Sequence, residues 1–328
     1  MSLNTLRLRS PADVVSAIPY LIGFHPADSV VMLACDNARG AYAVRLDLTA
    51  QDALLEHITD LMARRRPEGV IVAGYGPADR VTPMVDRVRA RLDASGVRLR
   101  EALRVEAGRF WSYLCSDNAC CPPEGTYVDV STSPVAAAAI AGGMVALPDR
   151  RDLERTLEST GGEPMRQATA KAERKLAAWA ESDAHKVPAH MITEGVPLVR
   201  DLIERACKGS DPPADDEVAW LGILLANLRV RDEAWVRMKD PDLDAHIRLW
   251  RHVLTRVTEP YAAAPACLLS FAAWRAGDGA LANIALDRAL SADPSYSMAR
   301  LLQELFISGL PPWSVPLDIT PEELDETD

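Results

Sequence analysis

Several features of membrane, secreted or nucleic-acid-binding proteins are missing from this sequence. The first 15 residues contain no apolar segment of the kind found in signal peptides. The most apolar run, Val135 to Leu147, is shorter than the roughly 20 residues that span a bilayer. The net charge is −11, whereas binding to a nucleic-acid backbone needs a basic surface. We therefore expect no membrane insertion and no nucleic-acid partner.

Cysteine is too scarce for a secreted disulfide framework, with six in 328 residues. A reducing cytoplasm is the simplest compartment for these thiols, and we expect cytoplasmic localisation. Aromatic residues make up only 5% of the chain, yet seven of them are tryptophans, and six of these follow residue 170. The C-terminal half is therefore expected to pack around large rings.

The first 155 residues have the pattern of an α/β domain. Two apolar runs of strand length predict a hairpin, and further strands alternate with amphipathic helices. This alternation predicts right-handed crossovers and a mixed, partly parallel sheet. Strands are expected at 29–34, 41–48, 70–73 and 97–106, and helices at 49–65 and 79–94.

After about residue 155 the sequence predicts helices and no strong strand. We expect an all-α domain over 156–315 and an acidic tail at 316–328. Near the end, Ala282, Ala289 and Pro294 fall where a tetratricopeptide repeat places small residues and its closing proline. A single copy predicts a tetratricopeptide-like helix pair rather than an array. The main helices are expected at 165–182, 196–207, 215–238 and 243–257.

Several segments resemble one protein family. The stretch from Leu8 to Val30, the strand from Val44 to Leu48 and the loop from Cys115 to Gly125 are similar to the domain of unknown function 4192 family, which is common in actinobacteria. Arg231-Asp232 and the stretch from Trp274 to Pro294 fit the same family. The resemblance covers nearly the whole chain. It implies a cytoplasmic bacterial protein and supplies no catalytic residue, because the family has no assigned function.

The turn at 23–29 is a first candidate for chemistry. His25 as a general base, Asp28 as its orienting carboxylate and Ser29 as a hydroxyl partner would suit hydrolysis or group transfer. A turn made rigid by Pro26 explains the same residues and is the favoured interpretation. Because the turn precedes a strand, we expect it at the end of the sheet opposite the usual ligand crevice.

A second group, Gly74, Gly76 and Asp79, follows a predicted buried strand and precedes a helix. Proteins with α/β folds bind anionic ligands at such positions because the amides at a helix N-terminus are unpaired. The three-glycine dinucleotide fingerprint and a phosphate-binding lysine motif are both missing, so a tight turn that needs glycine is favoured. Any ligand crevice in this domain is expected to be lined by this turn and by Arg45.

The third group is Cys115, Cys120 and Cys121. Three thiolates could bind zinc with a fourth ligand from elsewhere, but the two-residue separation typical of zinc ribbons and knuckles is missing. A redox pair between Cys115 and Cys120 is a second alternative. Small thiols packed beneath Pro122 and Pro123 are the third, and this packing interpretation is favoured over redox chemistry and zinc.

The sequence alone assigns no function. The missing catalytic motif and the repeat-like C-terminus favour a cytoplasmic adaptor or regulatory protein that acts through protein–protein contacts. The alternative is a small-ligand-binding protein or enzyme with a crevice in the α/β domain. The fold class does not discriminate between the two, because one fold serves many functions.

Overall fold

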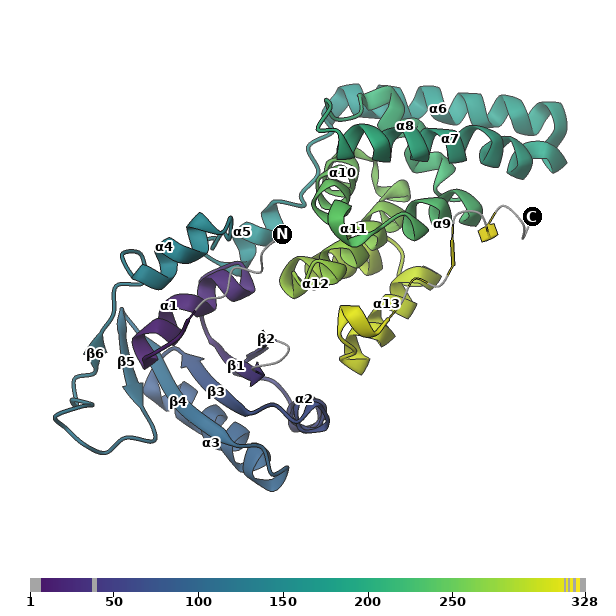
Figure 1. Ribbon diagram of the computed structural model, residues 1–328. Helices are drawn as coiled ribbons and strands as arrows, with labels where there is room; N and C mark the ends of the chain where they lie inside the picture. The colour runs from purple at the N-terminus through teal and green to yellow at the C-terminus, as the bar shows by residue number, and fades with distance from the viewer. Residues whose placement is uncertain (1–6, 37–39, 316, 318, 321–322, 325–328) are drawn as a thin grey trace. The chain divides into compact units, whose positions relative to one another are not determined.

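The chain forms two compact units, Met1–Leu153 and Glu154–Asp328 (Figure 1). The computed structural model describes residues 7–36, 40–315, 317, 319–320 and 323–324. Most of the expected acidic tail at 316–328 and part of the predicted hairpin turn lie outside the described residues. Among the described helices, none combines the length and the apolar character needed to cross a membrane.

The N-terminal unit is built on a six-stranded mixed sheet with the strand order β2-β1-β3-β4-β5-β6. β1 and β2 form the predicted antiparallel hairpin, and β3 and β4 run parallel, as a crossover through a helix requires. β1 is also antiparallel to β3, so the start of β1 lies beside the end of β3. The strands are β1 (Ser29–Asp36), β2 (Gly40–Asp47), β3 (Gly69–Tyr75), β4 (Leu99–Glu106), β5 (Arg109–Ser112) and β6 (Thr126–Tyr127).

Helices lie on both faces of this sheet (Figure 1). α2 (Asp52–Arg65) and α3 (Ala78–Ala94) bury their apolar faces against one side, in a core that includes Met32 and Val72. α3 approaches β3 closely because Gly74 has no side chain: a Cβ there would lie 2.3 Å from Val81 Cγ1. Gly74 therefore has a packing role.

The opposite face is covered by α1 (Pro11–Ile22), which packs against β2, β4 and α4 (Pro134–Ala141). The sequence patterns above did not predict α1. The Ser10 hydroxyl accepts a hydrogen bond from the Asp13 amide at 3.2 Å and caps its start. Gly23, at φ 82°, ends it in the left-handed conformation. The short helix α5 (Arg150–Arg155) follows α4.

The C-terminal unit is helical, and Trp250 and Phe271 are among its fully buried side chains. The single helix expected at 215–238 is wrong. The chain leaves the helix after residue 224, and the Asn227 side chain caps a new one by accepting the Arg229 amide at 2.9 Å. The helices are α6 (Gly162–Asp183), α7 (Val187–Cys207), α8 (Asp215–Leu224), α9 (Leu228–Val236), α10 (Leu243–Arg256), α11 (Ala263–Arg275), α12 (Gly279–Ala292) and α13 (Ser297–Ser308).

α11 and α12 occupy the span of the predicted helix pair and pack against each other. The small residues Ala282 and Ala289 are fully buried in this unit. The Ser270 hydroxyl donates a hydrogen bond to the Ala282 carbonyl at 2.7 Å, which links the two helices. The relation of this pair to tetratricopeptide repeats stays a prediction.

Candidate functional site

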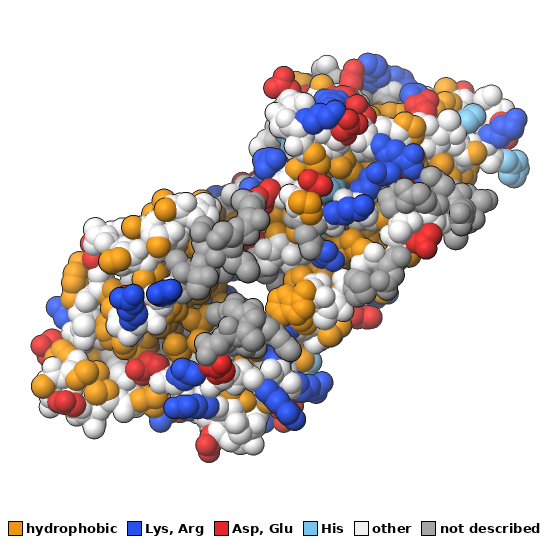
Figure 2. Space-filling view, viewed as in Figure 1, with side chains coloured by type: hydrophobic (Ala, Val, Ile, Leu, Met, Phe, Trp, Pro, Cys, Tyr) orange, Lys and Arg blue, Asp and Glu red, His pale blue; other side chains and the backbone are white. Residues whose placement is uncertain are grey.

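Three thiols gather in the loop between β5 and β6. The sulfur atoms of Cys115, Cys120 and Cys121 all lie within 4.8 Å of one another. Cys120 is exposed and the other two are half-buried, so packing against the prolines concerns Cys115 and Cys121 more than Cys120 and stays a prediction. Figure 2 shows apolar and acidic side chains side by side at the end of the unit where this loop lies.

A tight turn at Asp117 brings the distant cysteines together. The Asp117 carbonyl accepts the amides of Cys120 and Cys121 at 3.1 and 2.7 Å. The Asp117 carboxylate accepts the Ala119 amide at 2.9 Å, which fixes the turn from within. At the start of the loop, the Ser112 hydroxyl accepts the Cys115 amide at 3.1 Å. Backbone hydrogen bonds thus supply the proximity that the spacing of the cysteines does not suggest.

A tryptophan supports the far side of the loop. The Trp111 indole donates a hydrogen bond to the Pro123 carbonyl at 2.9 Å, and the Arg104 guanidinium lies 3.6 Å from the ring centre. Gly125 passes so close to this ring that a Cβ would lie 2.4 Å from Trp111 Cε2. Trp111, Cys115 and Cys121 also line a small hollow of about 80 Å³. The thiols therefore sit on a platform anchored to the sheet.

The thiols of the cluster differ in acidity. Hydrogen bonds from the Cys121 thiol and from the Asp117 amide lower the pKa of Cys115. The same contact with Cys115, together with burial, raises the pKa of Cys121 to about 12. A Cys115 thiolate is thus stabilised by hydrogen bonds from a neighbouring thiol and from an amide. A bound cation would take the place of the thiol proton and stabilise the thiolates further.

The donor set suits a thiophilic divalent metal. Zinc binds thiolate sulfur at about 2.3 Å, which on tetrahedral geometry places the sulfurs about 3.8 Å apart. The three thiols already lie within 4.8 Å of one another, so small side-chain rotations would bring them to that spacing. Among the described histidine, cysteine, aspartate and glutamate side chains, none joins them as a fourth ligand. The site therefore offers three sulfurs and one open position.

The other predicted site residues meet at one end of the sheet. Ser29, at the start of β1, lies opposite Asp47 at the end of β2 and opposite Tyr75 at the end of β3. The expectation that the turn at 23–29 lies opposite the ligand crevice is wrong, because β1 runs antiparallel to β3. The turn instead lies beside Gly76, at the carboxyl end of the parallel pair.

The groups proposed for acid–base chemistry are not linked at this sheet end. Asp28, at φ 44°, pairs with Arg80 at 2.7 Å rather than with His25. The Ser29 hydroxyl is buried and has no hydrogen-bond partner among the described residues. Burial lowers the pKa of His25. In this arrangement Asp28 is paired with Arg80 and does not orient the His25 ring.

Gly74, Gly76 and Asp79, the second predicted group, lie around the same end of the sheet. A Cβ on Gly76 would lie 3.5 Å from an Asp28 carboxylate oxygen, and Asp79 is exposed in the first turn of α3. Arg45 pairs with Asp47 at 2.7 Å. The two hollows described in this unit are lined by neither Gly74 nor Arg45. The structure thus brings the predicted residues to one edge of the sheet, outside both of these hollows.

Tyr75 carries a buried hydroxyl with no partner among the described residues, and burial raises its pKa. A buried hydroxyl without a hydrogen bond costs about 1–3 kcal/mol. We expect Tyr75→Phe to keep or raise the free energy of unfolding, by up to about 1 kcal/mol. Urea unfolding of the two proteins measures this difference.

Tyr113 provides the matched control, because its hydroxyl shares a hydrogen bond with Thr82 Oγ1 at 2.8 Å. Tyr113→Phe is expected to lower the free energy of unfolding by about 1 kcal/mol. A comparable loss for Tyr75→Phe would mean that the Tyr75 hydroxyl has a partner, such as a bound ligand at this end of the sheet.

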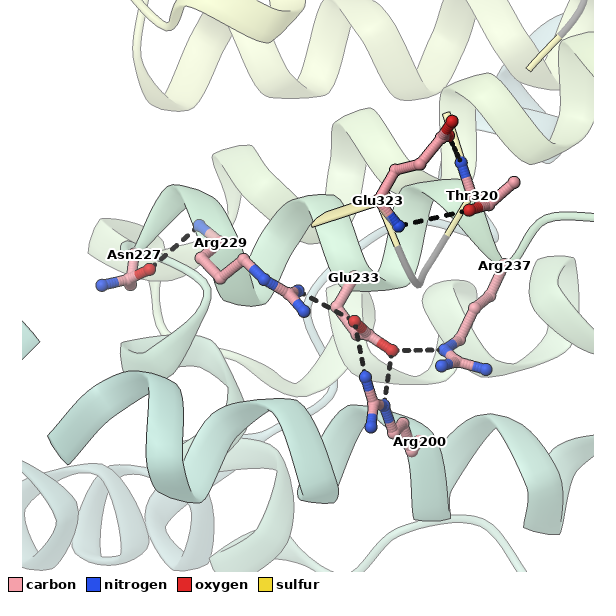
Figure 3. Close-up of polar contacts among 7 residues, drawn as sticks. All are labelled: Arg200, Asn227, Arg229, Glu233, Arg237, Thr320 and Glu323. Atoms are coloured by element: carbon pink, nitrogen blue, oxygen red, sulfur yellow. Dashed lines mark hydrogen bonds and ion pairs between the residues drawn. The ribbon is translucent and has the colours of Figure 1, made fainter. Parts of the chain in front are cut away.

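A charged cluster in the C-terminal unit was missed by the sequence patterns. The Glu233 carboxylate on α9 is fully buried and is bound by Arg200, Arg229 and Arg237 (Figure 3). Arg200 donates from Nε at 2.7 Å and Arg229 from Nη1 at 2.8 Å, and the third bond comes from Arg237 Nε. Arg229 and Glu233 on α9 and Arg237 at its C-terminal end are spaced four residues apart. In a sequence, this spacing of charges is typical of an exposed helix face, so it did not point to a buried cluster.

The chain belongs to the family described as domain of unknown function (DUF4192), whose model matches residues 11–313. This confirms the resemblance found in the sequence. No curated protein and no solved structure matches the chain. The family carries no activity to transfer, so the chemistry of this member has to be inferred from its own residues.

Proposed function

We propose that this member of the family is a zinc-binding regulatory protein, in which Cys115, Cys120 and Cys121 hold the metal. The observation that carries the proposal is the mutual approach of three sulfur atoms, all within 4.8 Å, in a loop ordered by backbone hydrogen bonds. Three soft thiolates favour zinc over magnesium or calcium, which take oxygen ligands.

The fourth position of the metal is left to a ligand from outside the loop. A site with three protein ligands keeps room for water or for a donor from a bound molecule. The neighbouring hollow of about 80 Å³ has room for such a small ligand. A partner protein that supplies the fourth donor would make zinc part of an interface.

That role is compatible with the predicted adaptor function, which stays a prediction. Leu301, Leu310 and Trp313 in the C-terminal unit are between 48% and 67% exposed. For the alternative, an enzyme or small-ligand binder with a crevice in the α/β domain, the hollows beside Gly96 and beside Trp111 include neither Gly74 nor Arg45.

Elemental mass spectrometry of untagged protein, purified without a chelator, tests the zinc site. We expect about one zinc per chain, because three thiolates hold the ion tightly even with an exchangeable fourth ligand. Cys115→Ser and Cys121→Ser are expected to lose the metal, because each removes one of the three sulfur ligands.

Cys207→Ser is the matched control, because Cys207 is also an exposed free thiol but lies in the other unit. We expect it to retain the full zinc content. Circular dichroism of every variant separates loss of metal from loss of fold. Folded wild-type protein that takes up no zinc on titration, or equal zinc content in all three variants, would rule out the proposed site.

A further inference from the structure

We propose that the cysteine loop is a peroxide-sensitive switch, in which oxidation joins Cys115 to Cys121 and releases the metal. The proposal rests on the proposed function for the metal, but the disulfide itself rests on the geometry of the loop. All three sulfurs lie within 4.8 Å of one another on an exposed or half-buried surface, so an oxidant from solvent reaches them.

The geometry selects one pair of the three thiols. Cys115 and Cys121 both line the small hollow beside Trp111, whereas Cys120 does not. A bridge between the adjacent residues Cys120 and Cys121 would need a strained ring that closes across a single peptide bond. Cys120 is the exposed thiol of the three and is left as a single sulfur, which is too few ligands to retain zinc.

The chemistry needs one equivalent of hydrogen peroxide and balances as follows. The Cys115 sulfur attacks one peroxide oxygen, the O–O bond breaks, and Cys115 becomes a sulfenic acid while hydroxide leaves. The Cys121 sulfur then attacks the Cys115 sulfur, the S–O bond breaks and the S–S bond forms, and a second hydroxide leaves. Protons from the thiols, or from solvent when zinc holds thiolates, convert both hydroxides to water.

The switch would act on the shape of the loop as well as on the metal. The two sulfur atoms of a disulfide are about 2.0 Å apart. The Cys115 and Cys121 sulfurs, which now lie within 4.8 Å of each other, must therefore move closer together. The loop is attached to β5 through Trp111 and Pro123, which limits the rearrangement to the segment between them. A partner that supplies the fourth zinc ligand would be released together with the ion.

The test is to treat zinc-loaded protein with one equivalent of hydrogen peroxide. Zinc release is followed with a chromophoric chelator, and the remaining free thiols are alkylated before tryptic digestion without reductant. The segment 110–150 between tryptic sites carries all three cysteines, so fragmentation of this one peptide maps the bridge. We expect one zinc released per disulfide, and the alkyl group on Cys120 alone.

Two variants sharpen the result. Cys120→Ser is expected to form the same bridge between Cys115 and Cys121, whereas Cys121→Ser is expected to lose it. Retention of zinc by the oxidised wild-type protein, any bridge that includes Cys120, or three alkylated thiols after treatment would overturn the switch. Wild-type protein that binds no zinc on titration but forms the Cys115–Cys121 bridge would contradict the zinc proposal and leave the oxidation chemistry standing.

Discussion

Replacing Glu233 with glutamine is expected to lower the free energy of unfolding at neutral pH by about 3–5 kcal/mol, the usual cost of breaking a buried ion pair. The Glu233 side chain is fully buried and binds Arg200, Arg229 and Arg237, so the variant leaves three guanidinium groups around a neutral amide. Urea unfolding at neutral pH measures the loss.

The pH dependence of this loss is a second readout of the same cluster. Burial raises the pKa of Glu233, but hydrogen bonds from Arg200, Arg229 and Arg237 outweigh it and bring the pKa from 4.5 to about 2. A carboxylate with a lowered folded-state pKa contributes its full stability above pH 4.5 and loses it as the pH falls toward 2. The difference between wild type and Glu233→Gln is therefore expected to shrink over that range.

Glu163→Gln is the control, because the Glu163 carboxylate pairs with Arg166 at 2.6 Å on an exposed surface. Solvent screens such pairs, so little change in the free energy of unfolding is expected. A small effect of Glu233→Gln, or one that does not depend on pH, would mean that water reaches the cluster and that its charges are not desolvated.

The second large effect is expected from Gly125→Ala at the end of the cysteine loop. A Cβ at Gly125 would lie 2.4 Å from Trp111 Cε2, and the ring cannot move freely because Pro123 and Arg104 hold it. We expect a loss of about 1–2 kcal/mol from the left-handed backbone and a further 1–3 kcal/mol or so from the clash. The variant is also expected to hold zinc less tightly against a competing chelator.

Gly143 gives a close match for this experiment. It has the same φ of +81° and lies in the same unit, but a Cβ there would meet nothing within 4 Å. Gly143→Ala therefore isolates the cost of the backbone conformation, about 1–2 kcal/mol. Equal losses in the two variants, with zinc binding unchanged, would show that Trp111 does not support the loop.

Much of the architecture could be predicted from periodicity, because it depends on local patterns. The β1–β2 hairpin, the helix over α3 and the parallel β3–β4 pair all follow from apolar runs and punctuation within short windows. α1 was missed because Pro19 lies inside it, and a proline in a helix interior normally argues against a helix, although Ser10 and Pro11 fit a helix start. The break between α8 and α9 depends on one capping residue, Asn227.

The relations between distant segments could not be predicted in the same way. The direction of β1 relative to β3 decides which end of the sheet holds His25 and Asp28, and no local pattern encodes it. The burial of Glu233 depends on Arg200, 33 positions away. Contacts between distant segments therefore determine both where His25, Asp28 and Ser29 lie and which arginines surround Glu233.

The cysteine site lies between these two cases. All three residues could be singled out from the sequence, but their spacing argued against zinc. Their proximity depends on the turn at Asp117, in which one carbonyl accepts the amides of both Cys120 and Cys121. This turn places Cys120 and Cys121 near Cys115, although the three lack the two-residue separation of known zinc motifs. The spacing of the cysteines in the sequence was therefore a poor guide to their proximity.

X-ray absorption at the zinc edge, on protein purified without a chelator, tests the three-thiolate site most directly. We expect three sulfur ligands at about 2.3 Å and one lighter atom at about 2.0 Å in the wild-type protein, and loss of the bound zinc in Cys120→Ser. A ligand set of nitrogen and oxygen alone, or a sulfur contribution that is unchanged when Cys115, Cys120 and Cys121 are all replaced, would contradict zinc binding by this loop.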